Sequence, residues 1–216
     1  MNSQQNIPNR QSGFSMIEVV VTLIILLLGL LGLVGVMIKS QRSELESYQR
    51  VQALVMLQDI AGRIEANRNV AGCYGALTAA ASGTPYLGTT GTTIPTAASC
   101  TTGTVTPTAQ QKTQFNNDLT AWNQLLLGAA ETLSASSVGS IIGARGCISY
   151  DATTEVNDPV SGIIAGTGIY TIAVAWQGLD TTAIPVSNCA QGLYGANDAQ
   201  RRVVSSTLRI GSLTAL

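Results

Sequence analysis

The chain has 216 residues, of which 11% are charged, and its formal net charge is −1. It contains no histidine, which excludes Ser-His-Asp and Cys-His catalysis and removes the commonest zinc ligand. So few basic residues also argue against a protein that covers a long stretch of nucleic acid.

A run of twenty uncharged residues extends from Val19 to Ile38 and follows a single acidic residue, Glu18. A helix of about 20 apolar residues crosses the roughly 30 Å hydrocarbon core of a bilayer. We therefore expect a transmembrane helix at residues 14–38. A carboxylate inside a membrane costs about 2.5–3.5 kcal/mol at the helix centre, so Glu18 should have a partner.

The polar residues 1–13 end in Gly13, directly before the apolar run. An ordinary secretory signal has its small-residue cleavage site after the apolar core, not before it. Cleavage after Gly13 would keep the core in the mature chain. An uncleaved signal anchor, or ordinary cleavage near Gly32 to Gly35, is the alternative, but neither accounts for Glu18.

Gly13, Phe14 and Glu18, followed by the uncharged run, resemble the start of type IV pilins. The resemblance implies that residues 1–13 are a prepilin leader, which a prepilin peptidase removes by cutting between Gly13 and Phe14. It also implies N-methylation of Phe14 and pairing of Glu18 with the N-terminal amine of a neighbouring subunit during assembly. The alternative for Glu18 is a side chain that reaches toward lipid headgroups.

Helical spacing of apolar residues continues after Lys39 and predicts one helix from about Phe14 to Asn67. Residues 39–68 would form its amphipathic continuation and pack on a globular domain at residues 69–216. The apolar positions of this continuation are Val51, Leu54, Leu57, Ala61 and Ile64.

The globular part begins with residues 69–110, which are rich in Thr, Gly, Ala and Ser and predict a long connecting loop. A short helix is expected at Thr113–Leu127, because Phe115, Leu119 and Trp122 share one helical face. Apolar alternation predicts three strands, at Ile141–Tyr150, Ile169–Trp176 and Val203–Ile210.

Together these elements predict an α+β protein. The strands would form an antiparallel β-sheet meander whose inner face packs on the second half of the long N-terminal helix. The resemblance to type IV pilins covers this layout of long helix, loop and sheet, and it implies a pilin-like fold.

Four cysteines, Cys73, Cys100, Cys147 and Cys189, follow the membrane segment. In an exported chain they indicate two disulfides, for which three pairings exist, whereas free core thiols or a zinc site would be the alternatives. We predict Cys73–Cys100, which would close the long loop, and Cys147–Cys189, which would tie the loop before the last strand to the sheet.

No residue pattern points to an enzyme, a cofactor or a metal site. Asp151, Glu155, Asn157 and Asp158 offer oxygen ligands for calcium, but they lack the glycine of an EF-hand loop and suit a polar turn. The pair Arg201-Arg202 is expected on a solvated face. We therefore expect a structural or binding role.

The segment Ala61–Arg68, Trp122 and the strand Tyr170–Trp176 look most like those of minor pilins of the PilV kind, the type IV pilus modification proteins. This resemblance implies a structural subunit for assembly or initiation of a bacterial type IV pilus, with roles in twitching motility, adhesion and DNA uptake. The implied partners are prepilin peptidase and other major and minor pilins. The implied location is the inner membrane, with the C-terminal domain in the periplasm, and later the pilus at the cell surface.

Two alternatives remain open at this point. A pseudopilin of a type II secretion system has the same kind of leader. A binding module displayed by the pilus for host-surface or DNA ligands would use the Thr/Gly-rich loop from Ala76 to Thr108.

Overall fold

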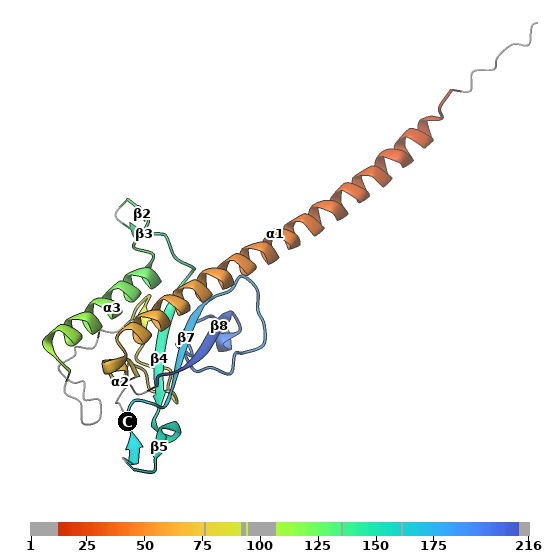
Figure 1. Ribbon diagram of the computed structural model, residues 1–216. Helices are drawn as coiled ribbons and strands as arrows, with labels where there is room; N and C mark the ends of the chain where they lie inside the picture. Colours follow the sequence, from red (N-terminus) through yellow and green to blue (C-terminus); the bar gives the residue numbers. More distant parts are fainter. Residues whose placement is uncertain are drawn as a thin grey trace, which may run out of the picture. The chain divides into compact units, whose positions relative to one another are not determined.

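The computed structural model describes residues 13–75, 77–91, 94, 107–134, 136–160 and 162–211 (Figure 1). It divides into two compact units, Met1–Leu45 and Glu46–Leu216. Helix α1 (Met16–Ala66) contributes residues to both units. Its observed bounds agree closely with the single long helix that the apolar spacing predicts.

In the first unit, helix α1 is exposed throughout its uncharged run, and none of residues 19–38 is buried. By length and composition this is a helix that can cross a membrane. Apolar side chains on every face of a helix are typical of a segment whose surroundings are themselves apolar.

In the second unit, helix α1 buries one face against the rest of the domain. The buried side chains are those of Ala53, Met56, Leu57, Ile60 and Ile64. Leu57 and Ile64 were predicted, whereas Val51 and Leu54 are exposed, so the predicted stripe is only partly right. This part of the helix carries apolar residues on more than one face, so spacing alone does not determine which face is buried. The buried face is the one on which the rest of the domain packs. Trp122 is part of that contact, and its indole N–H donates to the Met56 carbonyl at 2.9 Å.

The segment after helix α1 is more structured than the predicted loop. It contains η1 (Arg68–Val70), α2 (Ala71–Gly75) and β1 (Leu87–Gly88). The Thr78 backbone N–H donates to the Ile148 carbonyl at 2.9 Å, which ties this segment to the sheet. Residues 92–93 and 95–106 of the predicted loop lie outside the described residues.

Helix α3 (Ala109–Leu127) begins four residues before the predicted start. The reason is a capping box: the Thr108 hydroxyl accepts from the Gln111 N–H, and the Gln111 side chain accepts from the Thr108 N–H. The helix ends at Gly128, whose left-handed φ of 72° suits a residue without a Cβ. The predicted apolar face is confirmed, since Phe115, Leu119 and Trp122 are buried.

The main sheet contains β1, β4 (Arg145–Asp151), β7 (Ile169–Gln177) and β8 (Arg201–Arg209), in the order β1-β4-β7-β8. All neighbours are antiparallel, which confirms the predicted meander and adds β1 as a short edge strand.

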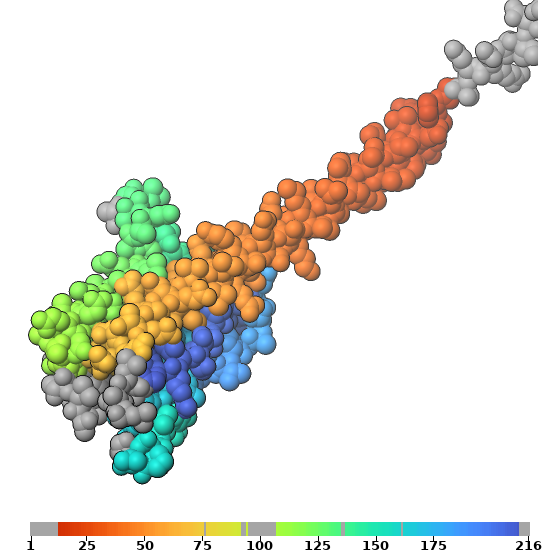
Figure 2. All heavy atoms as spheres, viewed as in Figure 1, coloured from red at the N-terminus to blue at the C-terminus, as the bar shows by residue number. Residues whose placement is uncertain are grey.

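Two small hairpins lie outside this sheet. One pairs β2 (Thr132–Leu133) with β3 (Ser136–Ser137), and the other pairs β5 (Val156–Asp158) with β6 (Gly162–Ile164). Short 3-10 turns, η3 (Ala152–Thr154) and η4 (Ala196–Asp198), precede β5 and β8. In Figure 2 the β5–β6 hairpin, in teal, projects from the surface of the domain.

Both faces of the sheet are covered. On one face the alternating residues of β7 join the core formed with helices α1 and α3: these are Tyr170, Ile172, Val174 and Trp176. On the other face, Ala173 and Ala175 lie in a smaller core with Tyr86, Tyr194 and the two half-cystines of β4 and the β7–β8 connection. The fold is therefore α+β, a long apolar helix packed on an antiparallel sheet, as predicted.

Substituting Gly146 of β4 tests this packing. A Cβ at Gly146 would lie 2.4 Å from Trp122 Cη2 and 2.7 Å from Leu126 Cδ1, inside a filled core. We expect Gly146→Ala to lower the unfolding free energy by about 1–3 kcal/mol or more, because overpacked cores must shift. Thermal unfolding of the detergent-solubilised full chain, followed by near-UV circular dichroism, measures this change.

Gly62→Ala is the matched control. Nothing lies within 4 Å of a Cβ at Gly62, and an alanine inside a helix is more stable than glycine by about 0.5–1 kcal/mol. The control should therefore raise the melting temperature. A melting temperature for Gly146→Ala equal to that of the unsubstituted chain would contradict the packing of α3 on β4.

Candidate functional site

The bond between Gly13 and Phe14 lies in non-helical backbone, since helix α1 begins at Met16. Among the described residues other than its chain neighbour, no atom lies within 4 Å of the place where a Cβ on Gly13 would lie, and Phe14 is 83% exposed. An accessible, non-helical segment is the kind of backbone that a protease can reach.

Glu18 lies in the first turn of helix α1, where its backbone N–H donates to the Ser15 carbonyl at 3.0 Å. Glu18 and Thr22 are four residues apart and share a helical face. Together with Val19 and with Phe14, which precedes the helix, they line one hollow. A carboxylate is also favourable near a helix N-terminus because it faces the positive end of the helix dipole. The arrangement can hold a cation beside the first turn of the helix.

The predicted disulfide Cys147–Cys189 is present, with the two Cα atoms 5.8 Å apart. It links β4 to the connection between β7 and β8. Cys73 is also disulfide-bonded. Cys100 lies outside the described residues, so the pairing Cys73–Cys100 stays a prediction.

The acidic residues that were weighed as calcium ligands hold turns and a hairpin. Asp151 accepts from the Thr153 N–H at 3.0 Å, and Asp158 accepts from the Val160 N–H at 2.8 Å. Glu155 accepts from the Tyr150 hydroxyl and from the Gly166 N–H. Burial, and then the hydrogen bond to Glu155, raise the pKa of Tyr150 to about 12. Among the residues that the structure describes, no three Cys, Asp or Glu side chains are grouped closely enough to hold a metal ion.

Arg201 corrects one expectation, because its side chain is buried rather than solvated. Its guanidinium lies 3.2 Å from the Asp198 carboxylate. It also donates to three backbone carbonyls of the β7–β8 connection, those of Pro185, Ser187 and Cys189. The side chain thus organises this connection from the inside.

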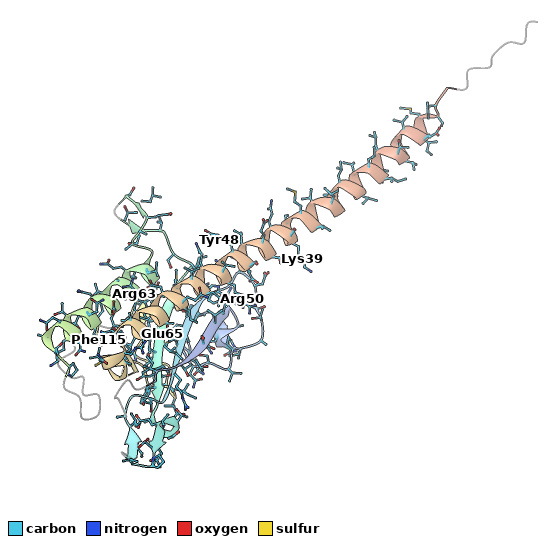
Figure 3. The ribbon with its side chains drawn as sticks, in the orientation of Figure 1. Lys39, Tyr48, Arg50, Arg63, Glu65 and Phe115 are labelled. Carbon is cyan, nitrogen blue, oxygen red and sulfur yellow. A yellow bond between two sulfur atoms is a disulfide. The ribbon has the colours of Figure 1, made fainter. Side chains whose placement is uncertain are left out.

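Asp118 is a buried acid on helix α3. Its carboxylate accepts from the Tyr74 hydroxyl at 2.6 Å, from Gln114 at 2.8 Å and from Arg63 at 3.4 Å. Burial, and then the bond to Asp118, raise the pKa of Tyr74. In Figure 3, Arg63 and Phe115 mark the place where helices α1 and α3 meet. The sequence offered one signal for the burial of Asp118, because it lies on the same helical face as the apolar residues Phe115, Leu119 and Trp122.

Arg145 lies between two tyrosine rings, 5.6 Å from the centroid of Tyr86 and 4.7 Å from that of Tyr194. Such cation–π contacts gain strength when they are desolvated. The Tyr194 hydroxyl donates to the Gly143 carbonyl at 2.9 Å, and burial raises the pKa of Tyr194 to about 12. Arg145 was not singled out from the sequence, where nothing distinguishes it from a surface arginine.

These tyrosines predict how the domain responds to alkali. The folded chain raises the pKa of Tyr74, Tyr150, Tyr170 and Tyr194 above the ordinary value of 10.0. The contribution of these raised pKa values to folding stability is therefore fully present below pH 10. It is lost as the pH rises from about 10 through 12, because the tyrosine hydroxyls ionise more readily in the unfolded chain than in the folded one. Phenolate absorbance and near-UV circular dichroism, recorded together, should change in the same transition. Ionisation of all six tyrosines near pH 10, with native circular dichroism retained, would contradict the burial of these side chains.

A comparison with family models places this site in a known context. The model described as "Prokaryotic N-terminal methylation motif" matches residues 8–34, which include Gly13, Phe14 and Glu18. No curated protein and no solved structure matches the chain. The motif and the exposed apolar helix that follows it support a type IV pilin-like protein. The motif implies processing by a prepilin peptidase and assembly with other pilins.

Proposed function

We propose that the chain is a minor pilin of the type IV pilus, of the PilV or pilus-modification kind, that takes part in pilus assembly and initiation. The observation that carries the proposal is the position of Glu18. It lies four residues after Phe14 in the first turn of helix α1, and twenty uncharged residues follow it. The sheet domain packed on the second half of α1 agrees with this role.

The proposed mechanism begins when prepilin peptidase cuts between Gly13 and Phe14. The cut frees a cationic amine on Phe14, which is then N-methylated and lies one helical turn from Glu18. A carboxylate that is buried without a partner raises the free energy of the protein, so contact with a cation lowers it. Pairing of Glu18 with the amine of a neighbouring pilin would therefore favour assembly and set the axial position of each subunit.

Before assembly, residues 14–38 would hold the protein in the inner membrane as a single span, with the C-terminal domain in the periplasm. After assembly the same residues would pack among the helices of other pilins. An apolar surface that faces lipid in one state and protein in the other needs no change of sequence, because both surroundings exclude water. Twitching motility and adhesion would follow from the pilus, and we propose no catalytic role.

A type II secretion pseudopilin is the second candidate, because the N-terminal methylation motif serves it equally well. Deletion separates the two, since loss of twitching motility indicates the pilus and loss of protein secretion indicates the secretion system. A pilus-displayed binding module for host surfaces or DNA would depend on the loop from Ala76 to Thr108, of which residues 76, 92–93 and 95–106 lie outside the described residues.

The mature N-terminus tests the processing step. We expect the protein purified from membranes or pili to start at Phe14 and to carry one added methyl group, because Gly13 is exposed and precedes the helix. Mass spectrometry of the intact chain and of its N-terminal peptide measures both. A chain that keeps residues 1–13, or one cut inside the apolar run, would contradict the proposal.

Glu18→Ala tests the assembly step. We expect this variant to be processed and to remain in the membrane but to be lost from sheared pili, because the amine of the neighbouring subunit has no carboxylate to meet. Immunoblots of membrane and pilus fractions compare the two pools.

Glu65→Ala is the matched control, because Glu65 is an exposed glutamate on the same helix (Figure 3). It should enter pili as the unsubstituted chain does. Equal incorporation of Glu18→Ala and Glu65→Ala would remove the proposed role of Glu18.

A further inference from the structure

We infer that Arg145, at the start of β4, forms a recessed binding site for a small carboxylate ligand, of about the size of acetate. The side chain of Arg145 is a cation inside the domain, since the residue is only 8% exposed. A buried charge is costly unless an opposite charge compensates for it. The inference concerns the folded domain alone and does not depend on the proposed role in a pilus.

The chain supplies no acidic side chain that neutralises this cation. All twelve Asp and Glu residues lie in the described part of the chain, and none of them forms an ion pair with Arg145. Asp198, whose carboxylate accepts from the Tyr194 N–H at 3.3 Å, pairs with Arg201 instead. Residues 66–117, which include the turn after β1, contain neither Asp nor Glu. A carboxylate that meets Arg145 therefore comes from outside the chain.

Three hydrogen bonds hold the guanidinium of Arg145 and leave part of it available. Nε donates to the Thr89 carbonyl at 3.0 Å, Nη1 to the Gly143 carbonyl at 3.3 Å, and Nη2 to the Thr90 hydroxyl at 3.2 Å. A guanidinium has five N–H groups, so one on Nη1 and one on Nη2 have no partner among the described residues. Nη1 and Nη2 are neighbours on one planar group, which is the arrangement that binds the two oxygens of a carboxylate.

Two tyrosine rings form the walls of the site. The rings of Tyr194 and Tyr86 are both buried, and their centroids lie 4.7 and 5.6 Å from the guanidinium carbon of Arg145. They keep water away from the cation, which strengthens its attraction for an anion. One carboxylate matches the single positive charge, whereas a phosphate group carries about −1.5 to −2 at pH 7 and would leave a buried negative charge uncompensated.

The site is open on the side of Gly143. Thr90 is exposed and Gly143 is half-buried, so two of the groups that hold the guanidinium reach the surface. Gly143 has a left-handed φ of 63°, which favours a residue without a Cβ. Apart from its chain neighbours, the nearest described atoms to a Cβ built there would be Arg145 Nη1 and Tyr194 Cε1, both at 3.6 Å. The absence of a side chain at Gly143 thus leaves space beside Nη1.

The experiment measures the melting temperature of the detergent-solubilised full chain while sodium acetate replaces sodium chloride at constant ionic strength. Near-UV circular dichroism follows the unfolding. Arg145→Met keeps an apolar side chain between the two rings but removes every N–H group of the site. Arg68→Met is the matched control, because Arg68 is an exposed arginine of the same domain.

We expect about 100 mM acetate to raise the melting temperature of the unsubstituted chain by roughly 2–6 °C, with saturation, because a ligand that binds only the folded state stabilises it. Arg68→Met should show the same rise, and Arg145→Met should show none. The absence of a rise in the unsubstituted chain would overturn the inference, as would an equal rise in all three proteins. A larger rise with inorganic phosphate than with acetate would also overturn it, because the site would then take a different anion.

Arg145→Lys replaces Arg145→Met if the latter does not fold. Lysine keeps the positive charge but lacks the planar fork, so the rise produced by acetate should fall to less than half of that in the unsubstituted chain. A rise in Arg145→Lys equal to that of the unsubstituted chain would show that the fork of Arg145 does not bind the carboxylate.

Discussion

The carboxylate of Glu18 precedes twenty residues without charge, and this contrast constrains how the rest of the molecule can be used. A charge at the edge of an apolar segment is tolerated near headgroups or beside a cation, and it is costly elsewhere. Glu18 lies in the first turn of α1 and lines a hollow together with Phe14, so a cation can approach its carboxylate only at the start of the helix. In the proposed function the chemistry of assembly is therefore concentrated at the start of the uncharged run.

The second half of helix α1 has a different task, because it holds a folded domain. It buries Ala53, Met56, Leu57, Ile60 and Ile64 in a core shared with α3 and the sheet. Two ion pairs add specific contacts to this packing. Arg63 pairs with Asp118 of α3, and Glu46 pairs with Arg202 of β8. One continuous helix therefore joins the uncharged segment to a domain in which it contacts both α3 and β8.

Much of the fold could be predicted from the sequence, because the periodicity of apolar residues in a long segment indicates whether the segment is a helix or a strand. The 51-residue helix, the face of α3 and the alternation in β7 followed from spacing alone. The two-residue strand β1 could not be predicted, since it exists only through pairing with β4. The burial of Asp118 also depends on partners far along the chain, Tyr74 and Arg63. The burial of Arg201 depends on carbonyl groups of the irregular connection before β8. The motif formed by Gly13, Phe14 and Glu18 could be found in the sequence, because its residues lie close together along the chain.

The disulfide between Cys147 and Cys189 has a mechanical consequence. It closes a segment with a sequence separation of 42 residues while its two Cα atoms lie 5.8 Å apart. Fully drawn out, a segment of that length would reach about 140–150 Å. A pull applied through the chain ends cannot lengthen this part, so β7 and most of β4 lie within a segment that stays closed under tension, whereas β8 lies outside it.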